Sequence, residues 1–414
     1  MRLRYTLGLI ALCLDLRAQG PQNFQQLESV AREKLAAHDT QGALAAYEKL
    51  AELAPRSAAY QDEIGFILAA TNRGPEALAH FQRATELDPR MAQAWFHLGA
   101  GLMIAQRTEA GVQALRKAVQ LAPDRADYHF RLGLAYSDSG HVANAVSQLT
   151  VAAREAPQNA GTWKALGIAY QRQNRPIQAR DAYRKALALD PQDPKIRDNY
   201  AYTLVVTGDP TGGLREFQRV LKSDPNNVHV QVNVGYAYIA AARYQEAIKQ
   251  LSGVLRTHPE NASAHYDLGI AYKQSDDLPH AREHLEQAVK LEPSLAEAHY
   301  SLGLIYVDAG EADQAIAQFR SAVQAKPDYA DAWFELGTLL KDRGDTDGAI
   351  GALRYSVALN DSDAGAFNSL GLLLKRKGDS EGAREAFAKA AALRQAEAEK
   401  KAKSLSEGAA RVAK

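Results

Sequence analysis

Residues 330–363 read ADAWFELGTLLKDRGDTDGAIGALRYSVALNDSD. The spacing of apolar residues in this stretch is sufficient to predict the structural unit of the chain. Its first half places Leu336, Leu339 and Leu340 at the spacings of three and four that bring side chains to one face of a helix. Gly344 is expected to end this helix by adopting the left-handed conformation. The second half, DTDGAIGALRYSVALN, has the same helical spacing of apolar residues. The stretch is therefore predicted to form a helix, a turn and a second helix.

The same pattern recurs along the chain every 34 residues, without insertion or deletion. One position is marked by glycine, with alanine in its place at 201: Gly65, Gly99, Gly133, Gly167, Gly235, Gly269, Gly303, Gly337 and Gly371. A second position is marked by proline: Pro55, Pro89, Pro123, Pro157, Pro191, Pro225, Pro259, Pro293 and Pro327. A fixed period of this length is typical of a stacked repeat array, in which each unit packs on its neighbours. The sequence thus predicts an all-α solenoid.

Small residues recur at a further position, twelve residues after the glycine. They are Ala43, Ala77, Gly111, Ala145, Ala179, Gly213, Ala247, Ala281, Ala315, Ala349 and Ala383. Two helices can approach closely where both carry small side chains, and a larger residue would cost about 1–3 kcal/mol in overpacking. Four further prolines follow the predicted turn, at the start of the second helix, where a missing N–H costs little; they are Pro75, Pro176, Pro210 and Pro279.

The composition of the 414 residues argues against several classes of function. The chain has 49 basic and 49 acidic side chains, so its formal net charge is zero. A general binder of nucleic acid or of anionic membranes would need a basic excess. The single cysteine, Cys13, allows no disulfide within the chain and no cysteine-based metal site.

Residues 1–20 have the features of a secretory signal peptide. Arg2 and Arg4 precede an apolar run over residues 5–14, and Ala18 and Gly20 provide small residues for cleavage. The run is too short to span a bilayer as a transmembrane helix. We therefore expect an exported protein, periplasmic or extracellular. The alternative is an N-terminal extension of a cytosolic protein.

The repeated residues resemble those of the tetratricopeptide repeat family. One unit shows the pattern W-x2-L-G-x2-Y, then Ala, an aromatic residue, Ala and Pro, as Trp163, Leu166, Gly167, Tyr170, Ala179, Tyr183, Ala186 and Pro191. Eleven such units fit residues 24–397, and the polar residues 398–414 are expected to form a C-terminal cap and tail. The sixth unit departs most from the pattern, with Ala201 and Arg197, so a change in superhelical pitch is expected there. The resemblance implies a right-handed superhelix of antiparallel helix pairs.

The resemblance also implies where a partner binds. In the family, positions 2, 5, 9, 12 and 13 of each unit face a concave groove. From these positions we select ten candidate residues for binding a protein or peptide segment: Phe66, Phe96, Phe130, Lys164, Arg172, Tyr202, Tyr236, Tyr266, Tyr300 and Phe334. The alternative is that some of these side chains only pack against neighbouring repeats. The clamp that grips chaperone tails in some members is not expected, because Ile168 follows Lys164 where that clamp needs Asn.

No sequence motif identifies a nucleophile, a general base, a metal site or a cofactor site. His280 and His284 have the H-x-x-E-H spacing that can bind zinc on a helix, but a third ligand is not evident. His97 has no evident partner, and His129, His265 and His299 are interpreted as packing residues. We therefore expect a non-catalytic scaffold or adaptor. Two alternatives remain: a substrate-recognition arm for a separate enzyme, such as a glycosyltransferase, or for a secretion or assembly machine; and an enzyme that depends on His280 and His284.

Overall fold

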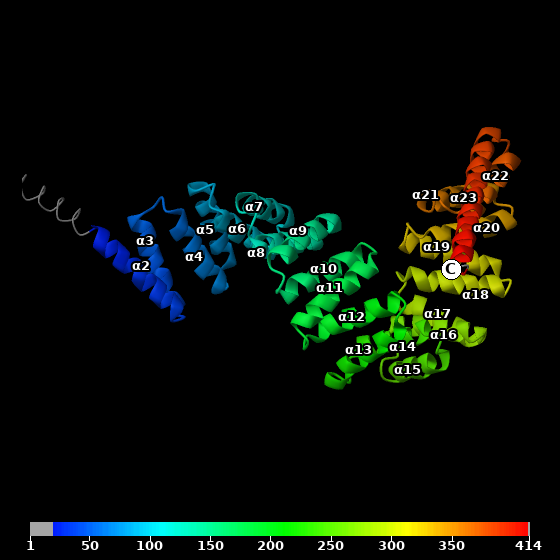
Figure 1. The fold of residues 1–414 in the computed structure, drawn as a ribbon, viewed down its shortest axis with the longest axis horizontal. Helices are drawn as coiled ribbons and strands as arrows, with labels where there is room; N and C mark the ends of the chain where they lie inside the picture. The colour runs from blue at the N-terminus through cyan, green and yellow to red at the C-terminus, as the bar shows by residue number, and fades with distance from the viewer. Residues whose placement is uncertain (1–19, 413–414) are drawn as a thin grey trace, which may run out of the picture. The chain divides into compact units, whose positions relative to one another are not determined.

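The computed structural model describes residues 20–412 (Figure 1), and the predicted signal peptide lies almost entirely outside them. Within the described range the chain forms 22 helices and no strand. Their bounds are α2 (Gly20–Ala36), α3 (Thr40–Leu53), α4 (Ala58–Ala70), α5 (Gly74–Leu87), α6 (Ala92–Ile104), α7 (Thr108–Leu121), α8 (Ala126–Asp138), α9 (Val142–Glu155), α10 (Ala160–Arg172), α11 (Pro176–Leu189), α12 (Pro194–Val206), α13 (Pro210–Ser223), α14 (Val228–Ala240), α15 (Tyr244–Thr257), α16 (Ala262–Gln274), α17 (Leu278–Leu291), α18 (Ala296–Asp308), α19 (Ala312–Ala325), α20 (Ala330–Asp342), α21 (Thr346–Leu359), α22 (Ala364–Lys377) and α23 (Ser380–Val412).

Each repeat consists of an even-numbered first helix and an odd-numbered second helix. Within each of the two units described below, the second helix of a repeat packs on the first helix of the same repeat and on the first helix of the repeat that follows. The all-α solenoid predicted from the 34-residue period is therefore confirmed. The polar residues from 398 onward, expected as a cap and tail, continue α23 as far as Val412.

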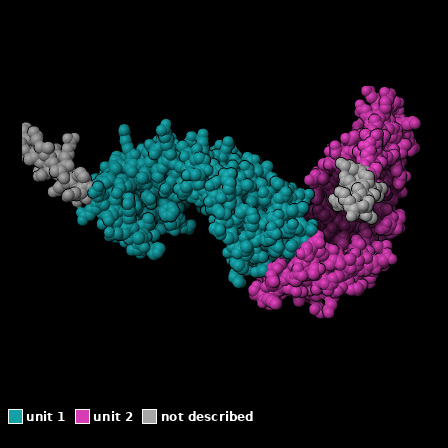
Figure 2. All heavy atoms as spheres, viewed as in Figure 1, with its two compact units in different colours: residues 1–207 teal, residues 208–414 magenta. Residues whose placement is uncertain are grey.

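The chain divides into two compact units, Met1–Thr207 and Gly208–Lys414, drawn in teal and magenta in Figure 2. The boundary falls in the turn of the sixth repeat, between α12 and α13. This is the repeat with Ala201 at the glycine position, which the sequence had marked as the most divergent internal unit.

The turn between the two helices of a repeat has the same backbone geometry in all eleven repeats. Its central residue has a positive φ, as at Gly344 (+81°), where the sequence predicted a left-handed helix end. Six repeats adopt this conformation without glycine, at His38, Asn72, Gln106, Asn174, Ala242 and Asp276. A left-handed backbone costs a residue with a Cβ roughly 1–2 kcal/mol, so packing of the helix pair must impose the turn where glycine is missing.

The fourth position of most repeats carries a side chain with an N–H donor. This nitrogen donates to the carbonyl oxygen of the repeat proline six residues earlier, and the nitrogen–oxygen distances are 2.5 to 3.1 Å. The donors are Trp95, His129, Trp163, Arg197, Gln231, His265, His299 and Trp333. A carbonyl oxygen can only accept, so each histidine must carry its proton on Nε2. The three histidines predicted as packing residues thus also hydrogen-bond the loop between repeats, as tryptophan does.

The first helices form the more closely spaced side of each unit. Contacts join successive first helices, as between α4 and α6 or α6 and α8 in unit 1, and between α14 and α16 or α20 and α22 in unit 2. Among the described residues, no two second helices make contacts of that extent. Each stack therefore bends with its first helices on the inner side.

Candidate functional site

The ten candidate residues lie on first helices, and their exposure differs. Phe66 and Tyr202 are open to solvent, with 46% and 37% of their surface exposed, and Arg172 is also exposed. The other seven are half-buried. We call the faces of the first helices around the fifth and ninth positions of each repeat the inner surface. Six candidates lie in unit 1, and Tyr236, Tyr266, Tyr300 and Phe334 lie in unit 2.

Aromatic rings in unit 1 pack on one another along this surface. The Phe96 ring stacks on the Tyr128 ring with centroids 4.6 Å apart, and the Arg125 guanidinium lies 4.5 Å from the Tyr128 centroid. Phe66 and Phe96 each contact the His97 ring, at 5.5 and 5.7 Å. The exposed ring of Phe66 is thus supported by a layer of aromatic side chains.

His97, which had no evident partner in the sequence, forms a hydrogen-bonded pair with Asp62. The distance from its Nδ1 to the Asp62 Oδ1 atom is 2.9 Å, and the Asp62 side chain is almost completely buried. The second oxygen, Oδ2, has no hydrogen-bond partner within the described part of the chain. His97 is therefore the group that satisfies a buried carboxyl beneath the aromatic layer.

The two basic candidates, Lys164 and Arg172, are engaged with neighbouring repeats. The Lys164 ammonium lies 2.8 Å from a carboxylate oxygen of Asp193, whose other oxygen accepts from backbone N–H groups at the start of α12. Arg172 donates to the carbonyl oxygen of Ser137 at 2.8 Å and to its hydroxyl at 3.0 Å. Both side chains link successive repeats.

In unit 2 the inner surface is rich in tyrosine. The Tyr300 ring lies 5.0 Å from the Tyr329 ring and 5.8 Å from the Phe319 ring. Burial raises the pKa of Tyr266 to about 12. Tyr329 was absent from the sequence-based candidates because it lies in the loop before α20, outside the groove positions that the resemblance provides.

Carboxyl groups follow directly after two of these aromatic residues. Burial raises the pKa of Asp267, next to Tyr266, to about 7. Glu335 follows Phe334, and its pKa is raised by burial and by the charge of Asp331. Both acids lie at the sixth position of their repeats, which is not one of the groove positions 2, 5, 9, 12 and 13 that provided the candidates. A comparison of neighbouring positions would have found the aromatic–acid pairs.

The pKa of Asp267 predicts a pH-dependent stability. Since its folded-state pKa exceeds the ordinary value of 3.8, the unfolded chain loses this proton first, and stability falls as pH rises from about 4 to about 7. Asp267→Asn removes this loss. We expect the variant to be more stable than the wild type at pH 8 by about 1–3 kcal/mol and similar at pH 4. Thermal unfolding at both pH values measures the difference, and a variant that is no more stable at pH 8 would contradict the assignment.

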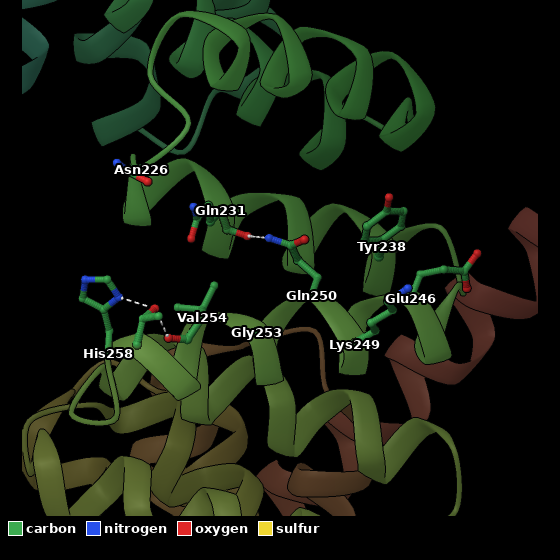
Figure 3. Close-up of a pocket in the computed structure, with 10 residues that line it drawn as sticks. Asn226, Gln231, Tyr238, Glu246, Lys249, Gln250, Gly253, Val254 and His258 are labelled. Atoms are coloured by element: carbon green, nitrogen blue, oxygen red, sulfur yellow. Dashed lines mark hydrogen bonds between the residues drawn. The ribbon is translucent and has the colours of Figure 1, made fainter.

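A separate cavity of about 830 Å³ lies in unit 2, away from the candidate residues (Figure 3). It is lined mainly by α14 and α15, and the Gln250 amide donates to the Gln231 carbonyl at 3.1 Å across it. Gly253 helps to leave it open, since the equivalent Lys185 and Tyr355 of other repeats cover Trp163 and Trp333. The absence of a side chain at Gly253 is thus one cause of the cavity.

His280 and His284 have the spacing of zinc ligands on a helix, but they form hydrogen bonds to different residues. His280 Nδ1 lies 2.8 Å from the Asp277 carboxylate, and His284 Nδ1 lies 3.0 Å from His265 Nδ1. Tyr272 stacks on both rings. In the part of the chain that the structure describes, no group of three or more His, Cys, Asp or Glu residues has an arrangement that could hold a metal ion. None of the helices between Gly20 and Val412 combines the length and the apolar character that crossing a membrane requires.

Family models match the chain over most of its repeats. The tetratricopeptide repeat domain of cytochrome c-type biogenesis protein H matches residues 138–265. Other tetratricopeptide repeat models match residues 63–126, 102–160 and 266–330, residues 306–370, and residues 364–397. Comparison with curated proteins gives no match.

Several solved structures are similar to the chain. The crystal structure of MamA is 28% identical, covers 40% of this chain and 97% of its own, and gives a TM-score of 0.37. Yeast Tom70 is 15% identical, with coverage of 90% and 92% and a TM-score of 0.48. The Naa15/Naa10 structure bound to HypK-THB is 16% identical, with coverage of 88% and 68% and a TM-score of 0.40. The family matches, the 34-residue period and the stacked helix pairs agree, and the chain belongs to the tetratricopeptide repeat family.

Proposed function

We propose that the chain is a non-catalytic scaffold or adaptor that binds a segment of another protein on the inner surface of its repeats. Membership of the tetratricopeptide repeat family makes the chain a protein-interaction scaffold. The observation that supports the inner surface as the binding site is the exposure of Phe66 and Tyr202 on first helices. Exposed aromatic rings on a rigid support are typical anchors of protein interfaces.

The test is site-specific photo-crosslinking in the native host. A photo-reactive residue at Phe66 or Tyr202 is expected to capture a partner protein, because both positions are exposed on first helices. The matched controls are Ile177 and Tyr355, which are 58% and 59% exposed on second helices. Crosslinks from the controls but not from Phe66 or Tyr202 would place the partner on the outer side and overturn the proposal.

A second candidate is a recognition arm that brings a protein substrate to a separate assembly machine. It is supported by the match of residues 138–265 to the repeat domain of a cytochrome c-type biogenesis protein. The same crosslinking experiment separates the two functions by what is captured. An enzyme or a membrane component of an assembly system, captured together with its substrate, would favour the recognition arm.

The proposed site of action is outside the cytoplasm, after export and removal of the leader. The support is the sequence of residues 1–20, with two arginines, a short apolar run and small residues at its end. Fractionation of the native host, with mass-spectrometric determination of the mature N-terminus, tests this location.

A further inference from the structure

The inner surface of unit 2 combines aromatic rings with carboxylates over three successive repeats. The aromatic residues are Tyr266, Tyr300, Tyr329 and Phe334, and the carboxylates belong to Asp267, Glu297, Asp331 and Glu335. We call these eight residues the tyrosine–carboxylate surface. They come from the first helices α16, α18 and α20 and from the loop that precedes α20.

The carboxylates and the rings lie close enough to influence one another. Burial raises the pKa of Tyr300, and the nearby charges of Glu335 and Asp331 raise it further. Tyr266 lies near Asp267 and Glu297, and the pKa of Tyr329 is raised by burial and, less strongly, by the same Glu297. One core cluster of buried residues supports all four aromatic side chains of the surface: Tyr266, Tyr300, Tyr329 and Phe334.

Most carboxyl groups of this surface form no ion pair with the described residues. Glu297 pairs with Lys326 at 3.0 Å. No lysine, arginine or histidine of the described residues has a nitrogen within 4.0 Å of a carboxylate oxygen of Asp267, Asp331 or Glu335. The nearest lysines along these helices, Lys273 and Lys341, follow six residues after Asp267 and Glu335, about 9 Å along the axis. The surface therefore has carboxyl groups that no basic side chain between Gly20 and Val412 pairs with, and a cation from another molecule could bind them.

Lys326 shows how this surface holds a cation. Its ammonium lies 3.0 Å from the Glu297 carboxylate and 5.0 Å from the centroid of the Tyr329 ring. Carboxylate and ring face attract an ammonium by charge and by cation–π interaction. Asp267 and Glu335 directly follow Tyr266 and Phe334 in the sequence, and neither pairs with a lysine of the described residues.

We propose that the tyrosine–carboxylate surface binds an extended protein segment that carries lysine or arginine side chains, with its cations against the carboxylates and its stems along the rings. The inference rests on the proposed function and adds the chemistry of the bound segment. A cation beside Asp267 would stabilise the ionised carboxylate that burial disfavours. Aromatic rings bury the aliphatic stems of lysine and arginine while the charged ends reach the acids.

The test uses the full chain and fluorescein-labelled peptides of equal length in which lysine or glutamate alternates with alanine. Binding is measured by fluorescence anisotropy at low and at physiological salt. We expect the lysine peptide to bind, the glutamate peptide not to bind, and the affinity to fall with salt. Equal binding of both peptides, or binding of neither, would overturn the inference.

A matched pair of triple variants locates the site. Asp267→Asn, Asp331→Asn and Glu335→Gln together are expected to weaken binding of the lysine peptide about tenfold or more. The control, Glu283→Gln, Glu381→Gln and Glu385→Gln, changes net charge equally on exposed second-helix positions and should leave affinity within about twofold. Equal weakening by both variants would show a general charge effect and refute the site. Circular dichroism confirms that each variant is folded.

The outcome also separates this inference from the proposed function. If Phe66 and Tyr202 still crosslink a partner while the lysine peptide fails to bind, the scaffold function stands and the cationic segment is refuted. If the lysine peptide binds through the three acids while Phe66 and Tyr202 capture nothing, the inference stands, and the proposed site in unit 1 is refuted.

Discussion

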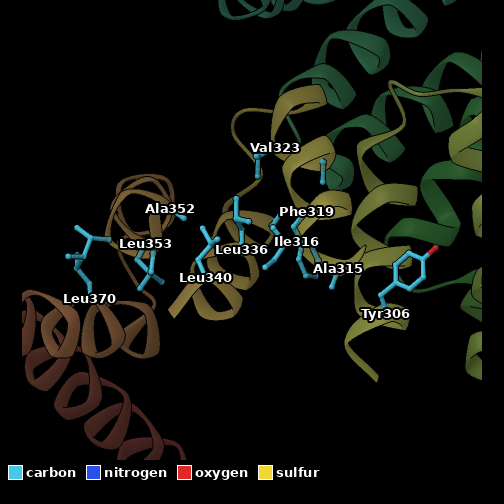
Figure 4. Close-up of a cluster of buried hydrophobic side chains, with 14 of the residues drawn as sticks. Tyr306, Ala315, Ile316, Phe319, Val323, Leu336, Leu340, Ala352, Leu353 and Leu370 are labelled. Carbon is cyan, nitrogen blue, oxygen red and sulfur yellow. The ribbon is translucent and has the colours of Figure 1, made fainter. Parts of the chain in front are cut away.

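Gly303→Leu is expected to lower the free energy of unfolding by about 3 kcal/mol. Gly303 of α18 faces the second helix α19, and a Cβ placed on it would lie 2.7 Å from the Cε1 atom of Phe319. Phe319 is fully buried and packs within a core that includes Ile316 and Leu336 (Figure 4). Because the ring cannot turn into solvent, a leucine side chain must push the two helices apart. Urea unfolding followed by circular dichroism measures the loss.

Gly351→Leu is the matched control for this substitution. Gly351 also lies within a helix, α21, but no atom lies within 4 Å of a Cβ placed on it. Leucine has a higher helix propensity than glycine, so this variant should gain up to about 1 kcal/mol. The same substitution is therefore expected to lower the free energy of unfolding at Gly303 and to raise it at Gly351, two positions of one unit. Equal effects at both would show that helix–helix distance does not depend on the glycine position.

His97→Leu is expected to cost about 3 kcal/mol, because it leaves the buried Asp62 carboxyl without its hydrogen-bond partner. Asp62 has one hydrogen bond among the described residues, the 2.9 Å contact to His97. The leucine itself would fit an aromatic environment made by Phe66, Phe81 and Phe96. The loss in stability therefore comes from the unpaired carboxyl. Thermal and urea unfolding of the full chain give its size.

The double variant His97→Leu with Asp62→Leu separates this cause from packing. Removing both polar partners takes away the desolvation penalty, so the second substitution is expected to restore most of the stability lost in the first. If the double variant is less stable than His97→Leu alone, packing of the two side chains accounts for the loss of stability, and the unpaired carboxyl does not. In the exposed pair of His280 and Asp277, 57% and 39% exposed, His280→Leu alone should cost less than about 1 kcal/mol, because Asp277 remains in water and still caps α17.

Sequence reasoning predicted the repeat unit and the positions of its small residues. The reason is that every unit forms the same helix–helix contacts, so the same types of residue recur at the same positions of the eleven units. The prolines at the start of second helices, such as Pro176 and Pro210, occupy the first turn as predicted. The left-handed turn could be predicted where it has glycine, as at Gly344, but not at Ala242, whose φ is 55°.

The candidate site was only partly predictable. The fifth and ninth positions could be read from the resemblance, but exposure depends on neighbours, so Phe66 is open while Tyr266 is largely covered. Lys164 and Arg172 look like free cations in sequence, yet their partners, Asp193 and Ser137, lie 29 and 35 residues away. Pairing at such separations follows from how repeats stack.

By itself, the sequence determined that the chain is a stack of 34-residue helix pairs with small residues at the helix contacts. These features follow from the spacing of apolar and small residues along the chain, because an α-helix brings residues three and four apart to the same face. The three-dimensional structure was needed to show that His97 pairs with Asp62 and that His129 donates to a proline carbonyl. It was also needed to show that Lys326 contacts both the Glu297 carboxylate and the Tyr329 ring. Two of these contacts, those of His97 and Lys326 with carboxylates, join residues that are 35 and 29 positions apart in the sequence. Hydrogen bonds and desolvation act over only a few ångströms, and the spacing of residues along the chain does not give distances of that precision between helices.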